Sequence, residues 1–444
     1  MITPFDLIHL GGETAVTGSS HLLILQNNLT IMVDCGSAMG HDKAVSFGNI
    51  PVKASDIDYL FITHAHIDHI GRIPELIEAG FDGEIICTQA TKALLGPMLD
   101  DGLSFSERSE KEKQQLQQKI DELAWGFEYN DTFTLKKDVT FKLKNAGHIL
   151  GSCFIQFEFP NNSKGRYSLV FSGDLGNINT PILPDPDTPD SCDFLVLEST
   201  YGNRNHPDRT HRTEHLGTLL NKALSDNGKV FIPAFALGRT QELLYEIDRL
   251  KAEGAIDTDI PVFIDTPLGL EITNIYSTLK EFWDKEAKDL MRKGDHPMDF
   301  KNLYAVESHH HHKKLLDMPG PAIIIAGSGM LTGGRMVSHL EKGLDDPRND
   351  VLFVGYQAQG TPGRTIVEQS QKKNGQARFN GHTIPIKAGI HALTGYSAHA
   401  DQNGLVNFVE SMPKKPGTIK LVHGEPDSQD ALKNVLMNKG YNVL

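Results

Sequence analysis

The chain has 444 residues, of which 39% are hydrophobic, and its formal net charge is −14. A chain of this length is too long for one ordinary hydrophobic core, which predicts two or three domains. The negative charge argues against a protein that coats nucleic acid, because such binding needs a large basic surface. It leaves room for a nuclease in which a few Arg and Lys hold phosphates locally. No stretch reaches the roughly 18–20 apolar residues that span a bilayer, so we expect no membrane partner.

The cysteines indicate a reducing compartment. There are four of them, widely scattered and without a CxxC pair: Cys35, Cys87, Cys153 and Cys192. This spacing is typical of reduced, buried thiols and not of a disulfide framework. The first residues also lack the basic and apolar regions of a signal peptide. We therefore expect a cytoplasmic protein.

The first 200 residues predict short apolar strands separated by Gly, Asn and Asp turns. The predicted strands are 21–25, 30–33, 59–63, 84–87, 168–172 and 193–197, and the predicted helices are 73–79 and 107–123. Several strands run directly into a polar residue, namely Asp34, His64, Asp174 and Glu198. Strand ends that support loops are where catalytic groups usually lie.

From about residue 206 strands and helices alternate, which predicts a parallel sheet covered by helices. The predicted elements are 214–225, 229–233, 239–252, 261–264, 269–287, 322–326, 335–340 and 350–354. We interpret 206–385 as a separate α/β domain between residues 1–205 and a tail, 386–444, that returns to strand and loop. A run of four histidines, from His309 to His312, is interpreted as a surface segment and not as a site.

The segment from His64 to His69 predicts a metal site. It places four potential ligands within six residues, directly after an apolar strand. Neutral imidazole suits Zn²⁺, and carboxylate oxygen completes or bridges its coordination. A tight loop can direct His64 and His66 at one metal and Asp68 and His69 at a second. The alternative, a polar loop with chance histidines, is weakened by the further ligands.

Two metals about 3.5–4 Å apart need more ligands than one loop supplies. His148, Asp174 and His423 each follow apolar residues and touch a glycine, which fits a strand end with a close backbone approach. Any one of them alone is more often a structural residue. Together with the first loop they form one consistent set of seven ligands.

These motifs resemble those of a known family. The run from His64 to His69 resembles the HxHxDH signature of the metallo-β-lactamase fold, and Asp34, His148 and Asp174 match its other motifs. Three further segments resemble the extra motifs of the β-CASP nucleases: Glu198-Ser199-Thr200-Tyr201-Gly202, Tyr396-Ser397-Ala398-His399-Ala400-Asp401 and Leu421-Val422-His423-Gly424-Glu425. The resemblance covers nearly the whole chain. It implies a four-layer αββα domain with an inserted α/β β-CASP domain of parallel sheet and helices, and an active site in the cleft between them.

The resemblance also implies residue roles. His64, His66 and His148 would bind one Zn²⁺, whereas Asp68, His69 and His423 would bind the second. Asp174 would bridge the two, and Asp34 would orient the ligand loop. The implied activity is hydrolysis of RNA phosphodiester bonds by a hydroxide held on two metals.

The leaving oxygen of such a reaction needs a proton. His399 is the candidate general acid, since only His has an ordinary pKa near neutrality, and Glu198 could hold its other ring nitrogen. A purely structural role for His399 is the alternative. Three loops of the 206–385 segment combine glycines with an arginine and favour anions. We expect their phosphate contacts at Ser328, Arg335, Arg239 and Arg364.

Other interpretations stay open. A thioesterase, lactonase or β-lactamase of the same fold needs neither the large inserted domain nor the pair of Glu198 and His399. A DNA-directed β-CASP nuclease usually carries an apolar residue where this chain has His423. A non-catalytic scaffold would have lost ligands, and a di-iron oxidoreductase would need a flavin module. The natural single-stranded RNA, the mode of cutting and a possible homodimer are not readable from the sequence.

Overall fold

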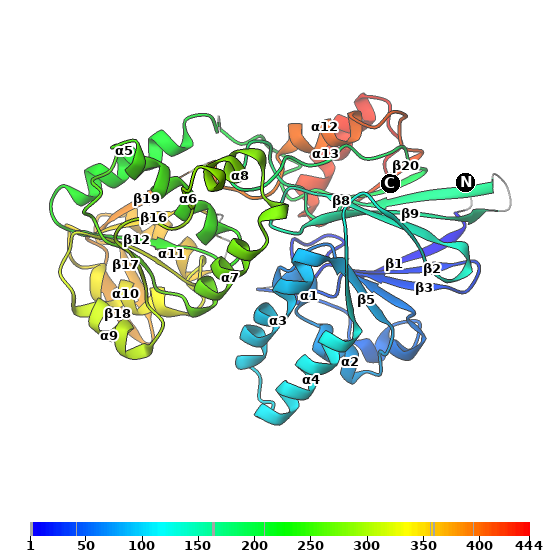
Figure 1. Cartoon of the computed structure of the whole chain (residues 1–444), viewed down its shortest axis with the longest axis horizontal. Helices are drawn as coiled ribbons and strands as arrows, with labels where there is room; N and C mark the ends of the chain where they lie inside the picture. The colour runs from blue at the N-terminus through cyan, green and yellow to red at the C-terminus, as the bar shows by residue number, and fades with distance from the viewer. Residues whose placement is uncertain are drawn as a thin grey trace. The chain divides into compact units, whose positions relative to one another are not determined.

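The computed structural model describes residues 3–40, 42–161, 165–207, 209–355, 357, 360–393 and 395–444. The chain forms two compact units (Figure 1): unit 1 comprises the residues up to 205 together with 398–444, and unit 2 comprises 206–397. Unit 2 ends later than the expected boundary at 385. The reason is that β19 (Gly389–Ala392) still pairs in parallel with β16 (Asp350–Phe353) of the unit 2 sheet.

Sheet 1 of unit 1 has six strands in chain order. They are β1 (Phe5–Gly11), β2 (Ser20–Leu25), β3 (Thr30–Val33), β4 (Tyr59–Phe61), β5 (Glu84–Thr88) and β6 (Ala124–Phe127). Neighbours from β3 to β6 are parallel. Four helices cover its outer face (Figure 1): α1 (Ile67–Ile70), α2 (Ile73–Glu78), α3 (Gln89–Ser104) and α4 (Glu110–Leu123). Short 3-10 turns lie at Phe47–Asn49, Ala54–Asp56 and Lys136–Asp138.

Sheet 2 of unit 1 also has six strands, in the order β20-β11-β10-β9-β8-β7. They are β7 (Thr132–Thr134), β8 (Thr140–Asn145), β9 (Cys153–Asn161), β10 (Gly165–Phe171), β11 (Phe194–Glu198) and β20 (Thr418–Val422). The last strand and the helices α12 (Gln402–Glu410) and α13 (Pro426–Asn438) come from the C-terminal segment. These helices pack on the outer face through buried residues such as Phe408 and Leu432.

The two sheets pack face to face through aromatic side chains. Phe61 of sheet 1 is fully buried, and its ring lies 5.0 Å from that of Phe141 and 4.8 Å from that of Phe157 in sheet 2. Alternate residues of each strand point into this interface, as the period of a half-buried strand requires. Helices outside both sheets complete four layers, so the predicted αββα fold of unit 1 is confirmed.

Unit 2 is built on a six-stranded sheet in the order β14-β13-β15-β12-β16-β19, and all its pairs are parallel. The further strands are β12 (Lys229–Pro233), β13 (Val262–Ile264), β14 (Leu303–Ala305) and β15 (Ala322–Ala326), and β17 (Gln376–Phe379) with β18 (His382–Pro385) forms a separate hairpin. The helices are α5 (Arg212–Leu224), α6 (Arg239–Ala252), α7 (Pro267–Thr278), α8 (Lys285–Arg292), α9 (His309–Asp317), α10 (Arg335–Gly343) and α11 (Pro362–Ser370). The predicted α/β domain with a parallel sheet is confirmed.

One predicted helix of unit 2 is wrong. Residues 269–287 do not form a single helix, because the chain breaks between α7 and α8 and makes a 3-10 turn at Lys280–Phe282. Trp283 is fully buried after this turn, and its indole N–H donates to the Tyr276 carbonyl. The side chain of Asp284 then accepts from the Ala287 amide at 2.7 Å, which starts a new helix.

The histidine run is a surface segment only in part. It begins α9, where its first three members are exposed. His312 is 3% exposed, and its Nδ1 lies 2.5 Å from Oδ2 of Asp265, which also lies 2.6 Å from Nε2 of His339. The surface interpretation is therefore wrong for His312, because α9 turns this side chain toward the sheet.

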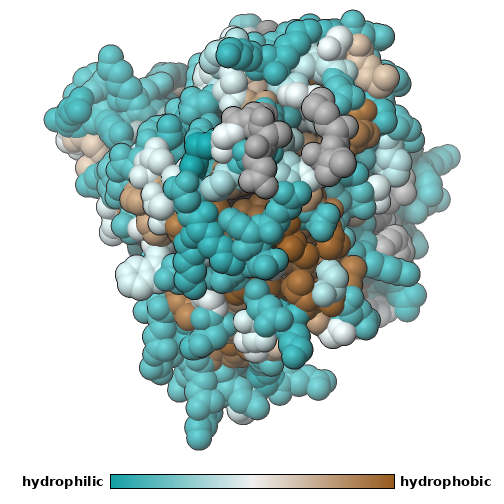
Figure 2. Space-filling model, turned by 90° about the vertical axis from the view of Figure 1, so that its right-hand side faces the viewer, coloured by the Kyte–Doolittle hydropathy of each residue, from teal (hydrophilic) through white to brown (hydrophobic). Residues whose placement is uncertain are grey.

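On the face drawn in Figure 2, hydrophilic residues surround a smaller group of apolar residues near the middle. Among the described residues, no helix has the length and apolar character needed to cross a membrane.

Candidate metal centre

Most of the predicted ligands lie on loops that follow strands of unit 1, and Asp68 and His69 lie in the short helix α1. His64 follows β4, Asp174 follows β10 and His423 follows β20. Strand β11 pairs in parallel with both β10 and β20, so the carboxyl ends of β10 and β20 lie at the same edge of sheet 2. The fold thereby gathers residues from distant parts of the chain.

Two glycines permit the close approach of these loops. A Cβ at Gly176 would lie 1.8 Å from the carbonyl oxygen of Gly147, beside His148. A Cβ at Gly36 would lie 1.6 Å from the carbonyl oxygen of Asp68. Any larger residue would therefore push the ligand loops apart.

The first ligand group consists of His64, His66 and His148. Nδ1 of His66 lies 3.0 Å from Nε2 of His64 and 3.2 Å from Nε2 of His148. Nitrogens that share a tetrahedral zinc lie about 3.3 Å apart when the Zn–N bonds are about 2.05 Å. The three rings thus converge at the spacing that a single zinc ion requires.

The second group consists of Asp68, His69 and His423. Nε2 of His69 lies 3.3 Å from Nε2 of His423, and Oδ2 of Asp68 lies 3.8 Å from the same His423 nitrogen. The hydroxyl of Thr200 lies 3.1 Å from Nδ1 of His423, which leaves Nε2 directed at the group.

Asp174 lies between the two groups. Its Oδ2 is 3.6 Å from Nε2 of His64 and 3.4 Å from Nε2 of His69, while its Oδ1 is 3.5 Å from Nδ1 of His423. A carboxylate with one group on each side has the position of a bridging ligand.

Hydrogen bonding alone does not account for this arrangement, whereas a cation does. Nδ1 of His66 lies within hydrogen-bond distance of Nε2 of both His64 and His148. A single hydrogen on one of these nitrogens cannot give all three of them a hydrogen bond. Oδ1 of Asp174 is buried and has no hydrogen-bond partner within the described part of the chain. Burying such groups without compensation is costly, and metal coordination removes the cost. The residues therefore fit a metal.

The protonation states of four predicted ligands also suit metal binding. Burial lowers the pKa of His66 to about 4 and holds the pKa values of His64 and His148 well below 6.5, so these imidazoles are neutral. Burial would raise the pKa of Asp68, but the hydrogen bond to His423 and the charge of His69 outweigh it and lower the pKa to about 2. Neutral His and ionised Asp are the forms that bind metals. His69 differs: burial would lower its pKa, but the charges of Asp174 and Asp34 raise it well above 6.5, so a metal would have to displace its proton.

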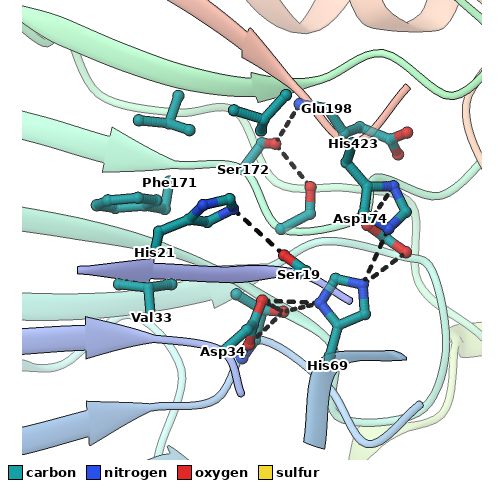
Figure 3. A pocket seen from close by; sticks show the side chains of 14 residues that line it. Ser19, His21, Val33, Asp34, His69, Phe171, Ser172, Asp174, Glu198 and His423 are labelled. Atoms are coloured by element: carbon teal, nitrogen blue, oxygen red, sulfur yellow. Dashed lines mark hydrogen bonds and ion pairs between the residues drawn. The ribbon is translucent and has the colours of Figure 1, made fainter. Parts of the chain in front are cut away.

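Asp34 orients His69 from behind (Figure 3). Its Oδ2 lies 2.7 Å from Nδ1 of His69, and the amide and hydroxyl of Thr63 donate to the same carboxylate. Nε2 of His69 then points toward Asp174 and His423. Asp34 has a left-handed φ of 59°, as His423 has at 50°, and such backbone strain in non-glycine residues concentrates at functional sites.

His399 and Glu198 lie beside the ligands. Nδ1 of His399 is 3.4 Å from Oε1 of Glu198 and 3.8 Å from Oδ2 of Asp174. Burial would lower the pKa of His399, but the charge of Glu198 and then that of Asp174 raise it to about 9. The amide of Leu175 donates to Oε1 of Glu198 at 2.7 Å and fixes this carboxylate. The side chains of His399, Glu198 and Asp174, with that of His423, are close enough to form a further candidate cation group.

The sequence did not indicate the residues that hold these groups in place. Thr63 and Thr200 contact Asp34 and His423 respectively, and the side-chain amide of Asn177 donates to the His399 carbonyl at 2.6 Å. Each of them lies close in sequence to a motif residue. Their closeness in sequence to the motif residues is the one feature from which Thr63, Thr200 and Asn177 could have been predicted.

The predicted phosphate contacts lie in unit 2, where all three of the arginines already have acidic partners. Arg239 pairs with Glu242, and Nη1 of Arg335 donates to Asp265 at 2.7 Å. Arg364 is 43% exposed and pairs with Glu368 on the surface. The Ser328 hydroxyl accepts from the Thr332 amide at 3.0 Å. Their role in binding RNA stays a prediction.

Comparisons with known proteins identify the family of the chain. Residues 14–234 match the metallo-beta-lactamase superfamily, 240–366 the Beta-Casp domain and 383–444 the Zn-dependent metallo-hydrolase RNA specificity domain. The chain is 34% identical to ribonuclease TTHA0252 of Thermus thermophilus over 98% of its own length and 97% of that protein. It is 31% identical to the transcription termination factor FttA of Methanocaldococcus jannaschii, over 97% of its own length and 69% of that protein. The chain therefore belongs to the β-CASP family of metallo-β-lactamase-fold proteins and is a metal-dependent hydrolase.

Proposed function

We propose that the chain is a zinc-dependent ribonuclease that hydrolyses RNA phosphodiester bonds at a centre for two metal ions. The observation that carries the proposal is the convergence of the two ligand groups on either side of Asp174. The name of the Thermus relative and the RNA specificity domain at residues 383–444 support RNA as the substrate.

Each ligand group would hold one zinc ion. His64, His66 and His148 would bind the first and Asp68, His69 and His423 the second, with Asp174 touching both. When bound, two zinc ions lower the pKa of a coordinated water toward 7 and neutralise charge on the phosphate. Asp34 keeps Nε2 of His69 directed at its metal by accepting a hydrogen bond from Nδ1.

His399 supplies the proton for the leaving oxygen. Glu198 faces its Nδ1, which stabilises the imidazolium and leaves Nε2 as the nitrogen that passes the proton on. Because Glu198 and Asp174 raise the pKa of His399 to about 9, the acid form is present at neutral pH. Removal of a positioned general acid typically slows such reactions by about 10²–10⁴-fold.

Unit 2 would hold the RNA strand. We assign phosphate contacts to Ser328, Arg335, Arg239 and Arg364, which lie in or after glycine-containing loops at the carboxyl ends of strands or at helix starts. Arg239 and Arg335 already pair with acidic side chains. Each guanidinium group would therefore have to bind a phosphate and its carboxylate partner at the same time.

The test is cleavage of end-labelled single-stranded RNA and DNA of one sequence by the purified full-length protein. We expect RNA cleavage that a chelator abolishes and that added zinc restores, with DNA left intact. A matched control is Glu425→Gln, an exposed residue beside His423 that should cleave as the wild type does. Cleavage of DNA alone, or RNA cleavage that persists in chelator after dialysis, would contradict the proposal.

A further inference from the structure

Unit 2 exposes an aromatic ring beside one of its glycine-rich loops. Phe235 follows β12 and is 44% exposed. Pro233 at the end of β12 pairs in parallel with Ala326 at the end of β15. The residues that follow the two strands therefore emerge side by side, with Phe235 next to the loop that begins at Gly327.

The ring of Phe235 lies against Gly329 of that loop. A Cβ at Gly329 would come within 3.1 Å of Cδ2 and Cε2 of the ring. Glycine thus lets the loop backbone rest on the aromatic side chain and hold it, while much of the ring stays exposed to solvent. The exposed part of the ring is a flat apolar face that a planar ligand could cover.

The same loop contains backbone hydrogen-bond donors at Met330, which is partly exposed, and at Gly329, which is buried. The amides of Gly329 and Met330 have no acceptor in the part of the chain that the structure describes. The Ser328 hydroxyl is partly accessible and is oriented by the Thr332 amide. The side chain of Gln357, 9% exposed, donates to the Gly329 carbonyl at 3.0 Å and fixes the loop. Donors without acceptors at a rigid loop suit a phosphate oxygen.

We propose that Phe235 is a stacking platform for one base of a single-stranded RNA whose phosphate is held by the Ser328 loop. The proposal rests on the proposed function and adds a base-binding position to it. An aromatic ring beside phosphate donors matches a nucleotide, which presents a flat π-face next to a charged phosphate. A protein partner would instead require a broader apolar patch than one ring. Because every base has a π-face, the position should accept all four bases.

The test measures RNA affinity by fluorescence anisotropy in the His399→Ala background, which should keep the metals but cut slowly. Phe235→Leu removes the π-face and keeps an apolar side chain, and it should weaken binding about ten- to hundredfold. Phe235→Tyr should bind as the parent does. Tyr304→Ala is the matched control, since Tyr304 is 46% exposed in the same unit but stacks on Phe263 of the neighbouring strand. Thermal unfolding of each variant checks that it is folded.

A scan with abasic nucleotides assigns the loss to stacking. In the parent, removal of the base at one position should weaken binding about as much as Phe235→Leu does. In Phe235→Leu, the same abasic RNA should show no further loss. Equal affinities of Phe235→Leu and the parent, or a flat abasic scan, would overturn the proposal.

The two proposals fail in different ways. If the wild-type protein cuts no RNA but the anisotropy differences are present, the proposed function fails and the stacking position stands. If it cuts RNA and Phe235→Leu binds as the parent does, the stacking position alone fails.

Discussion

Replacement of Glu198 by Gln tests whether Glu198 raises the pKa of His399, the proposed proton donor. The change keeps the shape of the side chain and one oxygen for the Leu175 amide, but it removes the charge that faces Nδ1 of His399 at 3.4 Å. An opposite charge at this distance raises the pKa of a His by about 1–3 pH units. The variant should therefore lose its acid form at a correspondingly lower pH.

The direction of the change in pH dependence follows from the raised pKa of His399. A His with a raised pKa is fully protonated below its ordinary value of 6.5 and loses the proton as the pH rises through about 9. Bound metals neutralise the Asp174 charge and lower this value in wild type and variant alike. The alkaline decline of kcat should thus move down by about 1–3 pH units in Glu198→Gln, and each unit corresponds to about 1.4 kcal/mol.

The assay measures kcat on one single-stranded RNA from pH 5.5 to about 9.5, a range that spans the expected alkaline decline of kcat. Zinc content is measured on the same samples, and Glu425→Gln serves as the control for loss of a nearby charge. An unchanged alkaline limb in Glu198→Gln, with metal content preserved, would refute the assignment of Glu198. Loss of zinc would instead show that Glu198 belongs to the coordinating set.

The remaining predictions concern other parts of the centre and the core. His399→Ala should keep its zinc and slow RNA cleavage by about 10²–10⁴-fold, and full activity in a single-turnover assay would remove it as the acid. Asp34→Asn should weaken zinc binding by about 10–100-fold in a competition with a chelator, because the amide holds His69 less firmly; unaltered affinity would count against it. Phe61→Ala should lower the free energy of unfolding by about 3–5 kcal/mol in urea titrations, since the fully buried ring fills the space between the sheets.

The parts of the centre that could be predicted from sequence are those encoded locally. His64 and Asp174 follow apolar runs and adjoin polar or glycine residues, so their position at strand ends is readable from the chain. The strands of both units are likewise short, strongly apolar segments bounded by turn residues. The match to known motifs then grouped the ligands.

The rest depends on contacts between distant residues. Nothing near Asp265 in the sequence indicates that it accepts from Arg335 and lies beside His312, because α9 and α10 bring these side chains together only in the folded unit. The break before Asp284 is similarly set by the burial of Trp283 and not by helix propensity. Exposure of Phe235 is also a tertiary property, since its sequence neighbours are those of an ordinary core segment.

The most direct test of the two-metal centre is a zinc titration of chelator-treated protein, with RNA cleavage and bound zinc followed together. We expect no cleavage at zero zinc and activity that saturates at two equivalents per chain, with Asp174→Ala binding less metal and staying inactive. Saturation at one equivalent, or undiminished zinc in Asp174→Ala, would contradict a pair of ions held on either side of Asp174.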